Sequence, residues 1–128
     1  MRTPRFGLLG ICVAAMIGCG GSGGGMSPRE LCEDLMTTAC SRSYDCYSSE
    51  ELSTMMFPAT EQECAMATIE ERMCSAQTRE TLCGDKKFRA DKAAACLDEL
   101  ASLSCPQVRD PDLNAAQATP SCTQICGE

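Results

Sequence analysis

Ten cysteines lie between residues 32 and 126 of this chain, and they constrain its fold more than any other feature. They are Cys32, Cys40, Cys46, Cys64, Cys74, Cys83, Cys96, Cys105, Cys122 and Cys126. A chain so rich in cysteine forms disulfides in an oxidising compartment, whereas in the cytosol the same residues more often bind metal or carry out catalysis. The N-terminal residues therefore decide how the cysteines are interpreted.

The first 18 residues have the layout of an export signal. Arg2 and Arg5 give a positive start, and an uncharged, mostly apolar run of 12 residues follows over 6–17. A membrane-spanning helix needs about 20 such residues, so this run is too short for a permanent anchor. A buried N-terminal helix would have to contain three glycines and lead directly into a glycine tract. Residues 1–18 are therefore predicted to be a cleaved signal peptide.

The residues around the predicted cleavage point resemble the lipobox of bacterial lipoproteins. Met16, Ile17 and Gly18 stand before Cys19, although Leu is more usual than Met at the first position. The resemblance implies that the Cys19 thiol receives a diacylglyceryl group and that a dedicated peptidase cuts before it. Because one acyl chain binds only marginally, two or three chains are expected on this residue. In a Gram-negative envelope, Gly20 after the lipidated cysteine would favour the outer membrane; a cleaved but unlipidated secreted form is the alternative.

The remainder divides into a tether and one domain. Residues 19–27 are rich in Gly and Ser, and a coil of this length has a reach of about 15 Å. Residues 28–128 fit a single domain. All 18 acidic residues but only nine of the 11 basic ones follow residue 18, which leaves a formal charge of −9. Such a surface repels phosphate backbones, so no nucleic-acid partner is expected.

The domain is predicted to be all-α, with three main helices and short C-terminal turns. The segment 27–30 matches a capping box with proline in the first turn, and predicts a helix that runs to about Ser41. The apolar positions expected on one face of this helix are Leu31, Cys32, Leu35, Met36, Ala39 and Cys40. The segment 60–63 repeats the capping box and predicts a second helix that ends near Ala76.

A third helix is predicted over residues 86–103. Its expected inward positions are Ala93, Cys96, Leu97, Leu100 and Leu103. Short helical turns are expected over 78–83 before Gly84, from Asp110 and Pro111, and from Pro120 onward. The last of these would place Cys122 and Cys126 on one face. A weak strand-like segment, 53–57, shows little alternation.

Export predicts five disulfides with no thiol left over. The core needs them, because the chain has no Trp and few other aromatic residues, and each native disulfide contributes about 2–4 kcal/mol. Ten cysteines allow on the order of a thousand pairings, so the sequence does not select one. Within one helix Cys32 and Cys40 would lie about 12 Å apart, beyond the limit of about 7 Å. The same distance argument disfavours Cys64 with Cys74, provided that both lie in one helix, and a bridge between Cys122 and Cys126 would be strained within a regular helix.

Metal binding is the alternative use of the cysteines. Zinc and iron–sulfur sites usually contain Cys-x2-Cys pairs, often with His, whereas the closest pair after residue 19 has three intervening residues and the chain has no His. The methionines suggest copper, but most lie on helical stripes and are interpreted as core filler. Met55 and Met56 are expected to tuck under the helices rather than contact a partner. No metal or cofactor is predicted.

The sequence also argues against an enzyme. Without His, Ser-His-Asp and Cys-His catalysis are excluded, and no phosphate-binding glycine motif follows a strand. Three acidic pairs suggest carboxylate catalysis but are interpreted as solvated helix faces and helix N-termini. They are Glu50 and Glu51, Glu61 and Glu63, and Glu70 and Glu71.

The whole layout, from signal and Cys-Gly-Gly to the late Pro120-Ser121-Cys122, resembles the small cysteine-rich lipoproteins of myxobacteria and their relatives. A non-enzymatic envelope lipoprotein, acting as an interaction or structural module, is therefore predicted. Its expected partners are the membrane through the lipid, the lipoprotein-processing and oxidative-folding machinery, and a protein of unidentified kind. A secreted inhibitor or ligand, and a thiol-redox or metal protein, are the alternatives.

Overall fold

The computed structural model describes residues 25–110, 112 and 115–128; the predicted signal peptide, the lipobox residues and Cys19 lie outside them. In chain order the elements are α1 (Pro28–Cys46), α2 (Ser49–Thr54), α3 (Glu61–Glu71), the 3-10 helix η1 (Cys74–Ala76), α4 (Arg79–Cys83), β1 (Lys87–Phe88), α5 (Ala90–Ala101), α6 (Cys105–Arg109), α7 (Ala115–Ala118), the 3-10 helix η2 (Pro120–Gln124) and β2 (Cys126–Gly127). The domain is mostly helical, with α1, α3 and α5 as its three main helices, which confirms the predicted fold class.

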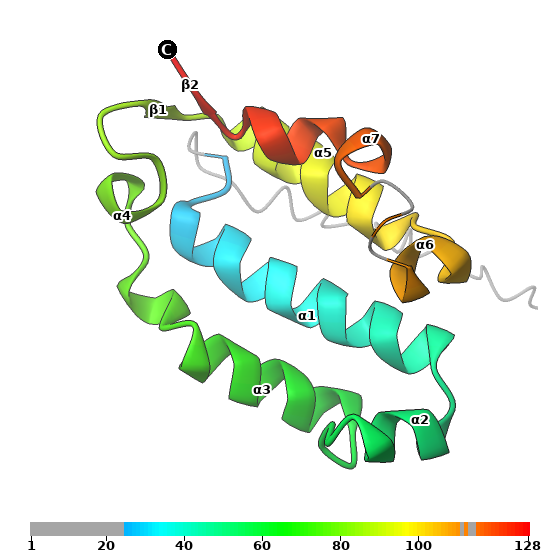
Figure 1. Ribbon diagram of the computed structural model, residues 1–128. Coiled ribbons are helices and arrows are strands. Elements are labelled where there is room, and N and C mark those ends of the chain that lie inside the picture. The colour runs from blue at the N-terminus through cyan, green and yellow to red at the C-terminus, as the bar shows by residue number, and fades with distance from the viewer. Residues whose placement is uncertain (1–24, 111, 113–114) are drawn as a thin grey trace, which may run out of the picture.

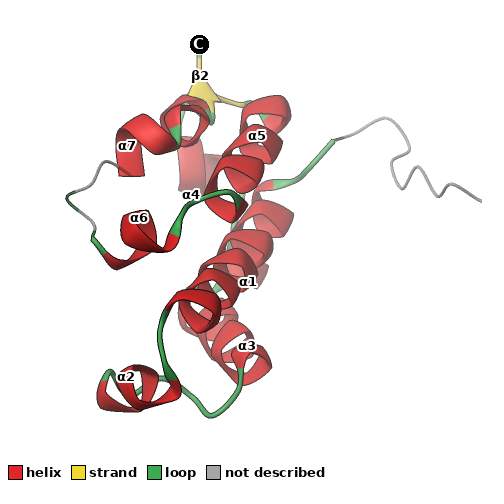
Figure 2. Ribbon diagram, turned by 90° about the vertical axis from the view of Figure 1, so that its right-hand side faces the viewer, coloured by secondary structure: helices red, strands yellow, loops and turns green. Residues whose placement is uncertain are grey.

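The three main helices form one layer with α1 in the middle. α3 packs along one side of α1 and α5 along the other (Figure 1), and α3 and α5 have next to no contact with each other. In the view turned by 90°, α5, α1 and α3 follow one another in a column, with α6 and α7 to one side of α5 (Figure 2). Because its main neighbours occupy two opposite sides, α1 keeps a face that neither α3 nor α5 covers.

The core consists of two clusters on opposite sides of α1. Between α1, α5 and the C-terminal segment, Leu31 packs with Ala93, Cys96 and Ile125. Between α1 and α3 the second cluster is built on the buried residues Cys40, Cys64 and Ala65, with Tyr44 and Phe57 packed against it. Half of the ten buried hydrophobic residues in the described part of the chain are cysteines. Sulfur therefore fills much of the interior that aromatic side chains would otherwise occupy.

Capping boxes start the first three α-helices. At α1, the Glu30 N–H donates to Ser27 Oγ at 3.2 Å, and the Ser27 N–H donates to the Glu30 carboxylate at 2.7 Å. The same reciprocal pair forms between Thr60 and Glu63 at α3, so both predicted starts are confirmed. A third box, between Ser48 and Glu51, starts α2. The weak strand-like segment 53–57 is the end of this helix and a turn, in agreement with the predicted all-α fold.

Two helix ends differ from the prediction. α1 continues past Ser41 to Cys46, and Ser43 lies within it with its hydroxyl donating to the Ala39 carbonyl at 2.9 Å. The predicted second helix is interrupted, since α3 ends at Glu71 and Met73 has a left-handed backbone with φ of 50°. Only the 3-10 turn η1 follows within the predicted range.

A short antiparallel ladder joins the C-terminus to the chain before α5. Lys87 pairs with Gly127 and Phe88 with Cys126, and the Arg89 N–H donates to the Ile125 carbonyl at 2.8 Å. These backbone bonds explain why α5 begins at Ala90 rather than at residue 86. The helical turn expected from Pro120 is confirmed as η2 and contains Cys122, but these bonds place Cys126 on β2, so its expected position on the same helical face is wrong.

The helical turn α6, which follows α5, was not predicted. α6 begins at Cys105, with Pro106 in its first turn, and ends before Asp110. Asp110 starts a turn as expected, since its carboxylate accepts the Asp112 N–H at 2.9 Å, whereas Pro111 lies outside the described residues. The turn over 78–83 is confirmed as α4, and Gly84 ends it with φ of 59°.

Candidate functional site

All ten cysteines of the described domain are paired. The bridges are Cys32–Cys74, Cys40–Cys64, Cys46–Cys105, Cys83–Cys126 and Cys96–Cys122. None of them joins two cysteines of one helix, in agreement with the distance argument from the sequence. The sequence alone gave no means of choosing this set, because the pairing depends on how the helices pack.

Three of the bridges start on α1, at Cys32, Cys40 and Cys46. They tie this helix to η1, α3 and α6 in turn, with Cα–Cα distances of 5.3, 6.0 and 5.0 Å. The other two bridges hold the C-terminal segment, one to α4 and one to α5. The central helix is thus fixed along its length, and the surface that it presents is held rigidly by covalent bonds.

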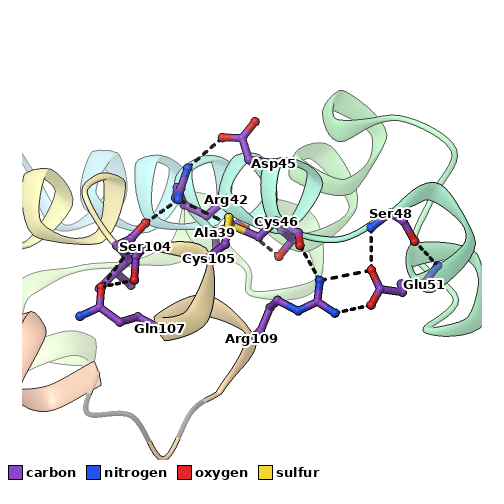
Figure 3. Close-up of a disulfide and its surroundings, with 12 residues drawn as sticks. Ala39, Arg42, Asp45, Cys46, Ser48, Glu51, Ser104, Cys105, Gln107 and Arg109 are labelled. Carbon is purple, nitrogen blue, oxygen red and sulfur yellow. Dashed lines mark hydrogen bonds and ion pairs between the residues drawn. A yellow bond between two sulfur atoms is a disulfide. The ribbon is translucent and has the colours of Figure 1, made fainter.

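Two arginines flank the bridge at the C-terminal end of α1 (Figure 3). Arg42 donates to Asp45 at 2.9 Å and also to the carbonyl of Leu103. Arg109 donates to the backbone carbonyl of Cys46 at 2.9 Å and forms an ion pair with Glu51. The last carbonyls of a helix lack partners within the helix, so Arg109 satisfies one of them while it joins α6 to α2.

Two of the three acidic pairs lie in the first turn of a helix, at α2 and α3. Glu51 has a pKa lowered from its ordinary value of 4.5, first by the hydrogen bond from the Ser48 backbone and then by Arg109. The Ser27 backbone and hydroxyl lower the pKa of Glu30 in the same way. Glu70 and Glu71 are exposed but lie in the last turn of α3, where a helix dipole does not favour negative charge. Glu70 and Glu71 therefore agree with the interpretation as a solvated helix face, whereas their interpretation as charges at a helix N-terminus is wrong.

The methionines do not fill the core as predicted. Met66 and Met73 are 58% and 67% exposed, and Met56 is 89% exposed, so the loop before α3 does not tuck its methionines under the helices. Phe57 is the residue of this loop that packs inward, edge-to-face on Tyr44 with ring centroids 6.0 Å apart. Met66 lies on α3 as the helical pattern predicted, but on a side of this helix that no neighbouring helix in the described part of the chain covers.

The face of α1 that neither α3 nor α5 covers is apolar and hollowed. Ala39, predicted to point into the core, is exposed there, and Met36 is half-buried. Beside Ala39 a hollow of about 260 Å³ opens between α1 and the segment from α5 to α6. The opposite side of α1 carries exposed polar residues, among them Asp34 and Asp45. This face could not be predicted from the sequence, because an apolar stripe on a helix does not show which of its residues a neighbouring helix covers.

Residues 25–110, 112 and 115–128, the part of the chain that the structure describes, contain neither a metal-binding cluster nor a membrane-spanning helix. In these residues no three side chains of His, Cys, Asp or Glu gather as metal ligands would. None of the helices described there is both long enough and apolar enough to cross a membrane. Comparison with known protein families, with curated proteins and with solved structures gave no match to the chain.

Proposed function

We propose that this protein is a lipid-anchored module of a bacterial cell envelope, with a disulfide-stabilised helical domain that acts through its surface rather than by catalysis. The observation that carries the proposal is the pairing of all ten cysteines after residue 25. Disulfides in this number form and persist in oxidising compartments outside the cytoplasm. The signal-like segment 1–18 and the lipobox ending at Cys19 supply the route of export and the anchor.

The role of interaction or structural module rests on how the polar groups are used. The carboxylates of Glu30, Glu51 and Glu63 cap helices, and the two arginines at the Cys46–Cys105 bridge join helix ends. The hydrogen bonds of these carboxylates and arginines are thus made within the scaffold and stabilise it. A rigid scaffold that presents an apolar groove is suited to binding a partner.

The anchor is tested by intact mass and by incorporation of labelled palmitate. We expect the membrane-extracted protein to begin at Cys19 and to carry the mass of two or three acyl chains. A Cys19→Ala variant should lose the label, whereas Cys12→Ala, which changes a cysteine of the predicted signal, should keep it. A processed chain without acyl mass, or a label that survives Cys19→Ala, would contradict the anchor.

The same preparations separate the two other functions. Recovery of all the protein from the culture supernatant would indicate a secreted inhibitor or ligand. Free thiols in the native protein would indicate a thiol-redox or metal protein, and alkylation without reductant followed by mass measurement counts them. We expect no alkylation of the ten cysteines until a reductant is added.

A further inference from the structure

Three neighbouring hollows along α1 share lining residues. Met36 lines the first two, and Ala39 and Ser43 line the second and the third. These residues follow one another three or four positions apart, so they lie on one side of the helix. The hollows therefore form a single groove from Pro28 to Ser43, which we call the α1 groove. At 1.5 Å per residue it is about 22 Å long, the length of about four helical turns.

The α1 groove is apolar, and its charge is the opposite of the molecule's. Leu82 and Val108 stand at its two ends, and Leu82 is 40% exposed. The chain has 18 acidic and 11 basic residues, yet among the described residues no Asp or Glu lines the groove. Its charged residues are Arg72 near the start of α1 and Arg42 near the other end. In so acidic a protein, this distribution marks the groove as a place for a negatively charged partner.

The two arginines differ in how far their donors are already used. Arg72 is exposed, and no ion pair or side-chain hydrogen bond in the described part of the chain uses its guanidinium. The Nε atom of Arg42 is buried and has no hydrogen-bond partner there, although the two terminal nitrogens of this side chain are engaged. Protein atoms cover Nε, so Arg42 contributes positive charge at this end, partly offset by Asp45 at 2.9 Å, and Arg72 is the arginine that is free to bind an acceptor.

A second copy of the chain fits this groove poorly. If two α1 grooves met in antiparallel orientation, Arg42 of each copy would face Arg72 of the other; in parallel orientation each arginine would face itself. Both arrangements bring like charges together in an apolar interface, which is unfavourable. An anionic membrane surface is repelled by the net negative charge of the domain. A separate helix brings no second arginine into the groove, and its few acidic residues at the ends lie against the two arginines, whereas a membrane would bring a whole anionic surface against the acidic domain.

We propose that the α1 groove binds an amphipathic helix of another protein, with acidic residues at both ends of its apolar stripe. Such a helix would lie along α1 as a further element of the layer, in the manner of helices that dock their apolar face into a groove. Ala39 and Ser43, both small, allow it to come close. This inference rests on the proposed role as an interaction module and is independent of the lipid on Cys19.

The test uses the exported, oxidised protein as the cell makes it, in nanodiscs if it is acylated and in buffer if it is not. The probes are two helical peptides of about 15 residues with the same Leu/Ala stripe, one with Glu and one with Lys at both ends. Titration of labelled peptide should show binding of the Glu peptide and at least about tenfold weaker binding of the Lys peptide.

Variants locate the binding. Ala39→Glu should weaken the Glu peptide at least about tenfold, whereas Ala94→Glu, at an exposed alanine of α5 that does not line the groove, should leave it unchanged. Arg72→Glu should abolish the preference between the two peptides, because Arg42 then favours one charge and Glu the other, whereas the exposed Lys87→Glu should leave the preference unchanged. Circular dichroism melting of each variant separates lost binding from lost folding.

Each contrary result has a distinct meaning. No binding up to about 1 mM, equal binding of the two peptides, or binding that Ala39→Glu leaves intact would overturn the proposal. Self-association or binding to phosphatidylglycerol vesicles that Ala39→Glu abolishes would overturn it in favour of a second copy or a lipid surface. An unacylated protein that binds the Glu peptide refutes the anchor alone, whereas an acylated protein that binds neither peptide refutes the groove alone.

Discussion

Cys46, the last residue of α1, is bonded to Cys105, the first residue of α6, across a sequence separation of 59 residues, with their Cα atoms 5.0 Å apart. This separation is the largest among the five bridges. The bridge holds the segment that follows α5 against the far end of α1. It also holds α6 at the end of the α1 groove, where Val108 is part of the lining.

Replacing both of these cysteines by serine should be costly. The chain-entropy estimate for a loop of this length is about 4 kcal/mol, and measured losses for native bridges in small domains are typically about 2–5 kcal/mol. We expect Cys46→Ser with Cys105→Ser to lower the free energy of unfolding by an amount in this range, measured by urea titration without reductant. Cys83→Ser with Cys126→Ser, which opens the 43-residue separation, is the matched comparison. A loss below about 1 kcal/mol for the first pair would mean that α6 is held by other contacts.

The pairing itself is open to direct measurement. Proteolysis of the oxidised protein at low pH, where disulfides do not exchange, should release linked peptides for the five bridges and for no other pair. The most informative peptide is the one that contains Cys40 and Cys64, because both cysteines are only 3% exposed and their bridge lies inside the α1–α3 core. Finding either residue linked to a different cysteine would refute the packing of α3 on α1.

The hydroxyl that starts α3 should matter for stability. Thr60 accepts the Glu63 N–H and anchors a capping box, and loss of such a cap typically costs about 1 kcal/mol. We expect Thr60→Ala to lower the free energy of unfolding by about that amount. Thr37, an exposed threonine within α1, serves as the control, since alanine has the higher helix propensity and Thr37→Ala should be neutral or slightly stabilising. Equal effects of the two changes would show that the cap does not contribute.

The sequence predicted what depends on local patterns. The capping boxes at Ser27 and Thr60 set two helix starts, and the three main helices follow from their apolar periodicity. The box at Ser48 was missed because the segment after it looked extended, although Glu51 stands three residues later as the pattern requires. A closer search for Ser or Thr followed by Glu would have found α2.

What the sequence did not predict depends on tertiary contacts. The backbone pairing of Phe88 with Cys126 delays the start of α5. Because the two residues are 38 positions apart in the sequence, no local pattern predicts this pairing. The left-handed turn at Met73 ends α3 where its periodicity would continue. The α1 groove could not be predicted for a related reason. Ala39 belongs to an apolar stripe, and it is exposed only because the three main helices form one layer.

The stability of the domain should fall in acid through its capping carboxylates. The pKa values of Glu30, Glu51 and Glu80 are lowered in the folded protein from an ordinary value of 4.5, chiefly by hydrogen bonds from backbone N–H groups. A group with a lowered folded pKa stabilises the protein above its unfolded pKa and loses that contribution as the pH falls through the folded value. We therefore expect the free energy of unfolding to be level above about pH 5 and to decline below about pH 4.5.

Glu51→Gln isolates one of these groups. At pH 7 the variant should be less stable than the parent protein, and the two should converge as the pH is lowered, because the parent carboxylate then becomes protonated. The neighbouring Glu50→Gln, at an exposed carboxylate that takes part in no capping box, should leave the curve unchanged. Urea midpoints measured from pH 7 to pH 2.5 compare the three proteins, and a constant gap between Glu51→Gln and the parent would contradict the assignment.

Two exposed methionines allow a test of backbone strain against helix propensity. Met56 is 89% exposed and has φ of 59°, in the left-handed region that costs a residue with a Cβ about 1–2 kcal/mol. Glycine adopts this region without that cost but is more flexible in the unfolded chain, so Met56→Gly should raise the free energy of unfolding by about 0.5–1 kcal/mol. Met66, which is 58% exposed within α3, provides the matched change. There glycine should lower stability by about 1 kcal/mol, because it is a poor helix former. Opposite signs for the two Met→Gly variants in urea titration are the expected outcome. A loss of stability at both positions would show that the side chain of Met56 makes contacts that outweigh the relief of its backbone.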